Sequence, residues 1–158
     1  MDFFAHGLWS YIIFNWIRRP IYAIFFGLLP DLMSWTIYLF YRLFNGEAIG
    51  KPALLNIPDW VYMLYNVSHS LFVVLLVFGI VYLIFKTVPI YMYAWPLHII
   101  LDIFSHSREF LPTPFLWPIS DWRFPGISWG HPTFMIINYA LIGICLGYLV
   151  YKKRFEKK

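Results

Sequence analysis

One predicted helical face carries two imidazoles and a carboxylate. His98, Asp102 and His106 lie four residues apart within an apolar run, and this spacing places side chains on one side of an α-helix, about 6 Å between successive Cβ atoms. Imidazole nitrogens and carboxylate oxygens are ligands that zinc and related divalent ions prefer. Burial of such groups without partners costs free energy. The pattern therefore predicts a buried metal site, and a polar network that joins helices is the alternative.

The rise of the helix limits how these three residues can share an ion. His98 and His106 are separated by about 12 Å along the axis, so one ion does not easily reach both. We expect either two ions that share Asp102, or one ion with the remaining group acting as a general acid or base. Zinc is the expected ion.

Three further ligand-type residues lie in or beside other apolar segments. His6 lies in the first segment, Asp31 follows a Leu-Pro dipeptide, and His69 lies between two serines whose hydroxyls can orient its imidazole. We expect all three to join the metal site, with Asp31 and His106 also in catalytic roles. An interfacial position is the alternative for His6. For Asp31, a helix N-cap after the proline is an interpretation compatible with ligation.

The segment 107–130 is rich in proline, tryptophan and arginine and is expected to form an ordered loop outside the membrane. Arg108 and Arg123 lie in it, and the planar guanidinium group suits a phosphate or carboxylate. Substrate binding by these two residues is one interpretation, and contact with lipid headgroups or nearby acids is the other. His131 precedes a proline and is expected to begin a helix rather than to join the site.

The composition is typical of an integral membrane protein. Apolar residues make up 61% of the 158 residues and charged residues only 13%, and the aromatic share of 23% suits a lipid-facing bundle with interfacial anchors. We expect one domain over residues 1–158. Cys145 is the single cysteine, which excludes an intrachain disulfide or a thiolate metal site. Because the basic residues cluster at the ends of apolar runs, the net charge of +4 does not indicate nucleic-acid binding.

The apolar segments predict an all-α bundle with about four to five transmembrane helices. The expected segments are 3–17, 21–44, 60–85, 88–106 and 131–151, with a polar loop at 45–59 and a basic tail at 152–158. Pro30 predicts a break near Gly27–Asp31, and Pro96 predicts a kink in the fourth segment.

The distribution of positive charge predicts the orientation. With a cytoplasmic C-terminus, eight of the twelve Lys and Arg residues lie on the cytoplasmic side and four outside, in accord with the positive-inside rule. The expected location is the inner (cell) membrane, crossed several times. In this topology the ligand-type residues gather toward the outer leaflet, so we expect a site that opens outward.

The order of these motifs resembles that of the bacterial membrane-bound metal-dependent hydrolases of the YdjM-like group. The matching motifs are His6, Leu29-Pro30-Asp31, His69-Ser70, His98 with Asp102, and the prolines Pro112 and Pro118 that follow. Their order is also similar to the ligand order of zinc-dependent phospholipase C. The resemblance covers roughly residues 1–120, with Asn66 where the family often has a basic residue, and it implies a membrane-embedded metal-dependent hydrolase.

We therefore expect a hydrolase that acts on a lipid ester or lipid phosphodiester at the outer leaflet, with metal-activated water as the nucleophile. Membrane lipid is then both environment and substrate. Three other classes use similar residues: a cation or proton transporter, a haem protein, and a structural protein whose polar residues join helices. Haem ligation does not require the neighbouring carboxylates. The lack of acidic or His residues near the inner ends of the spans argues against a path through the membrane.

Overall fold

The computed structural model describes residues 1–48, 50 and 52–155, and all regular structure in that part of the chain is helical. The elements, with η marking 3₁₀-helices, are α1 (Phe3–Phe14), α2 (Pro20–Met33), α3 (Trp35–Phe44), η1 (Leu54–Asn56), α4 (Asp59–Ser68), α5 (Leu71–Phe85), η2 (Ile90–Tyr93), α6 (Ala94–Ser105) and α7 (Pro132–Phe155). The all-α class predicted from the sequence is confirmed. As expected, the segment 107–130 contains no helix.

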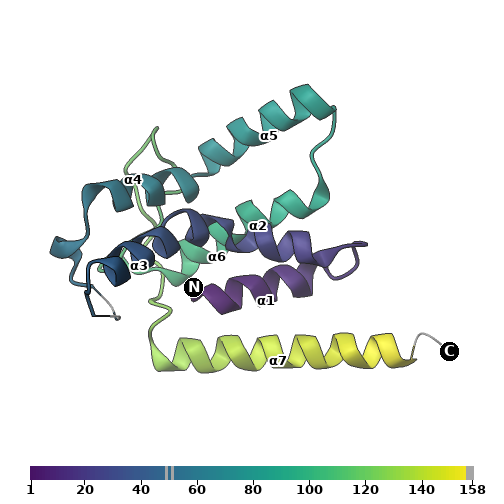
Figure 1. Cartoon of the computed structure of the whole chain (residues 1–158). Coiled ribbons are helices and arrows are strands. Elements are labelled where there is room, and N and C mark those ends of the chain that lie inside the picture. Colours follow the sequence, from purple (N-terminus) through teal and green to yellow (C-terminus); the bar gives the residue numbers. More distant parts are fainter. Residues whose placement is uncertain (49, 51, 156–158) are drawn as a thin grey trace.

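Helices α1, α2 and α6 pack against one another and form the part of the bundle that positions the polar residues (Figure 1). Small side chains lie at their crossings: Ala5, Ala23 and Ala94 are completely buried. Short side chains let helix backbones approach closely, since no bulky group separates them. Helix α7 lies along one edge beside α1, and α5 extends away from the bundle (Figure 1).

The break in the second apolar segment lies later than the sequence predicted. Pro30 is inside α2, and the chain bends by 51° between α2 and α3 at Ser34. There the Ser34 hydroxyl donates to the Pro30 carbonyl at 2.9 Å, and the Ser34 N–H bonds to Asp31 instead of continuing the α-helical pattern. The predicted break at Gly27–Asp31 is therefore wrong, and Asp31 lies in the last turn of α2 rather than at a new N-terminus.

The third apolar segment, expected as a continuous helix over 60–85, is also broken. Helices α4 and α5 meet at 57°, with His69 ending α4 and Ser70 capping α5 by accepting a hydrogen bond from the Val73 N–H at 3.2 Å. A serine N-cap satisfies a helix N–H that has no partner within the helix. Pro96 lies in the first turn of α6, where a proline interrupts no helical hydrogen bond.

Within the described residues, α7 is the one helix long and apolar enough to cross a membrane. Its 24 residues span about 36 Å. The number rises to three if α2 with α3, and α4 with α5, each count as one bent span. The prediction of four to five crossings is thus not confirmed. The predicted basic tail begins within α7, which continues to Phe155, and residues 156–158 lie outside the described part of the chain.

Candidate metal centre

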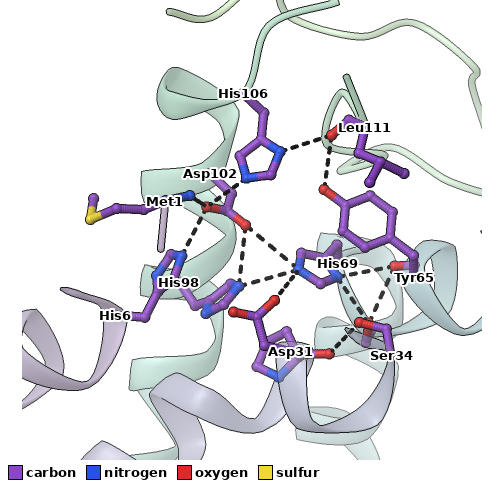
Figure 2. A network of polar contacts seen from close by, with 12 residues as sticks. Met1, His6, Asp31, Ser34, Tyr65, His69, His98, Asp102, His106 and Leu111 are labelled. Carbon is purple, nitrogen blue, oxygen red and sulfur yellow. Dashed lines mark hydrogen bonds and ion pairs between the residues drawn. The ribbon is translucent and has the colours of Figure 1, made fainter. Parts of the chain in front are cut away.

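Six ligand-type side chains meet at the centre of the bundle, as Figure 2 shows. They come from five parts of the chain: His6 on α1, Asp31 on α2, His69 between α4 and α5, His98 and Asp102 on α6, and His106 directly after α6. All are buried except Asp31, whose side chain retains 13% of its exposure. The structure thus brings together every residue that the sequence predicted as a ligand.

Asp102 is the central residue of this cluster because each of its oxygens faces a different pair of imidazoles. Its Oδ1 lies 2.9 Å from His6 Nε2 and 3.4 Å from His106 Nε2. Its Oδ2 lies 3.2 Å from His98 Nε2 and 3.6 Å from His69 Nε2. The amino group of Met1 also donates to Oδ1. The carboxylate therefore divides the cluster into two halves.

Helix geometry and a tight turn explain how α6 supplies three of these groups. His98 and Asp102 are one turn apart on the buried face of α6, as their spacing predicts. His106 is the first residue after the helix and has an extended backbone. Its imidazole still reaches the cluster, because Nδ1 donates to the carbonyl of Leu111 at 2.9 Å.

Backbone carbonyls fix the orientation of three imidazoles. Nδ1 of His98 lies 2.7 Å from the Gly27 carbonyl, Nδ1 of His106 lies 2.9 Å from that of Leu111, and Nδ1 of His69 lies 3.2 Å from that of Tyr65. A carbonyl oxygen only accepts, so each Nδ1 carries the proton. In the neutral ring Nε2 then presents a lone pair, and all three Nε2 atoms face Asp102. Metal-binding histidines are commonly oriented by such contacts.

The contact between His69 and His98 exposes the consequence of this orientation. Their Nε2 atoms are 3.2 Å apart, and each is an acceptor beside the acceptor Oδ2 of Asp102. Acceptors buried together repel one another unless a proton or a cation lies among them. Protonation of His98 would create an ion pair with Asp102, and a metal ion would satisfy several of these atoms at once.

Two groups of three have ligand atoms close enough to share an ion. His6, Asp31 and His98 form one, and His69, His98 and Asp102 form the other, with all ligand atoms in a group within 4.8 Å of one another. Nδ1 of His6 and Nε2 of His106 are buried without a hydrogen-bond partner. These residues therefore fit a divalent metal ion, although the same side chains also form ion pairs with one another.

The close crossing of α1 and α2 depends on Gly27. A Cβ at this position would lie 1.8 Å from Oγ and 2.8 Å from Cβ of Ser10 on α1, which only glycine avoids. The resulting approach stacks the His6 ring on that of His98, with centroids 3.6 Å apart. Gly27 thus contributes both the space for α1 and the carbonyl that orients His98.

Tyr65 and Leu111 support the cluster but were missed by the sequence analysis. The Leu111 carbonyl accepts from both the Tyr65 hydroxyl, at 3.1 Å, and His106 Nδ1. Leu111 has a φ of +48°, a conformation that is uncommon outside glycine and is concentrated at functional sites. The spacing from Tyr65 to His69 is four residues, so helical periodicity offered a signal for the tyrosine. Nothing local in the sequence indicated the backbone conformation of Leu111.

The two loop arginines and His131 lie apart from this cluster. Arg108 is exposed and donates to the backbone carbonyl of Arg123 at 3.3 Å. Arg123 is half-buried, and this burial lowers the pKa of its guanidinium group, while the charge of Asp121 opposes the shift. His131 is exposed and directly precedes α7, as expected for a residue at a helix start.

Comparison with protein-family models, curated proteins and solved structures finds no match to this chain. The similarity to membrane-bound metal-dependent hydrolases therefore remains a prediction from the motifs, and the candidate site is argued from its own geometry.

Proposed function

We propose that this protein is a membrane-associated, metal-dependent hydrolase that acts on a lipid ester or lipid phosphodiester. One observation carries the proposal: the Nδ1 protons of three buried imidazoles are held by carbonyls, so that the Nε2 lone pairs converge on Asp102. A purely structural network would gain more from alternating donors and acceptors, since each contact would then be a hydrogen bond.

The division of the cluster by Asp102 favours two ions over one. His6 and His106 face Oδ1, and His98 and His69 face Oδ2. A carboxylate can use its two oxygens for two different ions. Asp31 lies 3.8 Å from His69 Nε2 and adds a second carboxylate on the Oδ2 side. Zinc suits this set of nitrogens and oxygens.

Such ions, when bound, make water acidic enough to supply a nucleophile near neutral pH. The residues of the chain have separate tasks around that chemistry. Asp31 is the carboxylate that retains exposure, so it is placed to accept a proton from water and return it to the leaving group. His106 also borders the adjacent cavity and contributes either a ligand or a proton donor. Gly27, Tyr65 and Leu111 hold imidazoles in position.

The bilayer is the proposed source of the substrate. Helix α7 can cross a membrane, and the helices expose large apolar side chains, such as Leu75 at 68% and Ile136 at 70%. An active site in a bundle so placed is reached by lipids more readily than by water-soluble molecules. The proposed location is the cell membrane, with the site toward the outer leaflet and the C-terminus in the cytoplasm.

The first test is the metal content of detergent-purified protein prepared without chelators. Wild-type protein should contain one or two zinc, manganese or iron ions per chain, and Asp102→Ala should lose them. Asp121→Ala is the matched control, because it removes an exposed loop carboxylate. Absence of metal from wild-type protein, even after incubation with zinc, would leave the cluster as a structural network and refute the proposal.

The second test is hydrolysis in liposomes that contain ester and phosphodiester lipids. Product should appear with the metal-loaded protein, disappear after chelation and return when zinc is restored. Bound metal without hydrolysis of any lipid class would retain the metal site and reject the enzymatic role.

A further inference from the structure

A cavity of about 680 Å³ opens beside the candidate metal centre. Asp31 and His106 border it, one from each half of the cluster, so its inner end reaches the proposed reaction site. The cavity also touches Trp35 and Leu39 on α3, and Phe110 and Trp129 in the loop 107–130. It is therefore continuous with the site and has an apolar wall leading away from it.

The spacing along α2 and α3 gives this wall a direction. Leu32, Trp35 and Leu39 recur at intervals of three and four residues, as on one face of a helix. Leu39 lies about two helical turns beyond Asp31 and is 40% exposed, which places it toward the outer part of the cavity. An apolar chain that lies along this wall would have its polar end at Asp31 and His106.

The charge of the lining restricts the polar end of such a ligand. The described residues that border the cavity include two carboxylates, Asp2 and Asp31, and no Lys or Arg. Arg108 and Arg123 do not border it, so they offer no partner for an anion there. An anionic headgroup would meet uncompensated negative charge along the cavity, whereas an uncharged ester would not.

The volume favours one acyl chain. A methylene group takes up about as much space as a water molecule, about 30 Å³, so a chain of about 16 carbons fills roughly 480 Å³ and two such chains roughly 960 Å³. One chain and its ester group fit a cavity of about 680 Å³, but two full chains do not.

We infer that the substrate of this site is an uncharged carboxylic ester with a single long acyl chain, held along Leu32, Trp35 and Leu39 with its carbonyl beside Asp31 and His106. The inference rests on the proposed hydrolase function and narrows its substrate class. In the reaction, the oxygen of water forms a bond to the carbonyl carbon, and the bond from that carbon to the alkoxy oxygen breaks. The alkoxy oxygen takes up a proton that water released, and the products are one carboxylic acid and one alcohol.

The inference is tested by the chain-length profile of metal-loaded protein with p-nitrophenyl esters of two to sixteen carbons. Wild-type kcat/KM should rise with chain length, by up to about fourfold per added methylene. Leu39→Trp should move the preferred length to shorter chains, because the indole fills the outer part of the cavity. Ile21→Trp is the matched control. Ile21 is an exposed residue of a separate apolar groove between α2 and α5, so this change should leave the profile unaltered.

A competing lipid separates the ester from the phosphodiester. A neutral monoacylglycerol should be hydrolysed at least tenfold faster than a lysophospholipid of the same chain length. Hydrolysis with an unchanged profile in Leu39→Trp, or a preference for the phosphodiester, would overturn this inference and leave the hydrolase function standing.

Binding to metal-free protein distinguishes the failure of the cavity from the failure of catalysis. The probe is a twelve-carbon glycerol ether, which is uncharged and cannot be hydrolysed, with dodecyl phosphate as the anionic counterpart. Wild-type protein and Ile21→Trp should bind the ether more tightly than the phosphate, and Leu39→Trp should weaken ether binding at least fivefold. This result without any hydrolysis would support the cavity and reject the enzyme, whereas equal ether binding by all three proteins would overturn the cavity inference.

Discussion

Tyr65 illustrates how a residue outside the ligand set can control it. Its hydroxyl and His106 Nδ1 donate to the same carbonyl, that of Leu111, and the Tyr65 carbonyl accepts from His69 Nδ1 at 3.2 Å. One residue therefore touches the supports of two imidazoles. Contacts of this kind commonly change metal affinity by about 10- to 100-fold when they are removed.

Tyr65→Phe should weaken the metal site without abolishing it. The change removes the hydrogen bond to Leu111 but leaves the Tyr65 backbone, and with it the acceptor for His69. We expect a loss of about 1 kcal/mol in the free energy of unfolding and a drop in zinc affinity of up to about tenfold. Both are measured in detergent, by denaturant unfolding and by competition with a zinc indicator.

Tyr62→Phe is the control for that experiment. Tyr62 also donates to a backbone carbonyl, that of Leu54, at 3.0 Å, but does so at the surface. Its removal should leave zinc affinity unchanged. An equal loss of zinc affinity in both variants would mean that the contact with Leu111 does not orient His106.

At the scale of elements, the crossing of α1 and α2 sets the distance between His6 and His98. The two rings stack with centroids 3.6 Å apart because Gly27 leaves room for Ser10. Helix packing and metal geometry are thus coupled, so a change that separates α1 from α2 also separates two ligand groups that come from different helices.

Gly27→Ala should reduce zinc affinity and stability together. Its Cβ would lie 2.8 Å from that of Ser10, and overpacking of this kind costs about 1–3 kcal/mol. Gly79→Ala, in α5, meets no atom within 4 Å and should leave zinc affinity unchanged while it stabilises the helix by up to about 1 kcal/mol. The measurements are thermal unfolding and zinc titration of the purified variants.

A second substitution tests whether the contact with Ser10 is the cause. Ser10→Gly combined with Gly27→Ala removes both atoms of Ser10 that the new methyl group meets. The double variant should regain most of the zinc affinity lost in Gly27→Ala. Failure to recover any would show that the carbonyl of residue 27, rather than the helix separation, determines the effect.

The elements also show which parts of the site were accessible from the sequence. The pairing of His98 with Asp102 is local, because one helical turn fixes it, and it was predicted. The bends at Ser34 and His69 were not: each depends on serine hydrogen bonds that compete with helix continuation. The positions of His6 and Asp31 relative to α6 depend on packing between helices. Their residue types therefore predicted membership of the site but not its geometry.

At the scale of the whole molecule, the cluster replaces part of a conventional apolar core. Its imidazoles and Asp102 are buried where the helices meet, and the apolar core is divided into four separate groups of side chains. Buried polar groups stabilise a fold only when their interactions are satisfied. If metal satisfies them, the stability of the bundle depends on metal binding.

Zinc should accordingly stabilise the wild-type protein against heat. A ligand that binds only the folded state at 100 times its Kd adds about 2.7 kcal/mol, which corresponds to a rise in Tm of about 5–10 °C for a chain of this size. Asp102→Ala should show no such rise, whereas Asp121→Ala should respond like the wild type. Differential scanning fluorimetry in detergent, with magnesium as an oxygen-preferring control ion, provides the measurement. A similar rise in Asp102→Ala would place the responsible zinc site elsewhere.

The orientation of α7 decides which side of the membrane supplies the substrate. Its C-terminal turn carries Lys152, Lys153 and Arg154, and such clusters favour the cytoplasmic side. The loop 107–130 joins α6 to the other end of α7, so it should lie outside. Single cysteines placed in a Cys145→Ser background report both positions. Asp121→Cys should react with a membrane-impermeant maleimide in intact cells, and Arg154→Cys only after permeabilisation. The reverse pattern would place the loop, and the cavity that Trp129 borders, on the cytoplasmic side, and labelling of both in intact cells would mean that α7 does not cross.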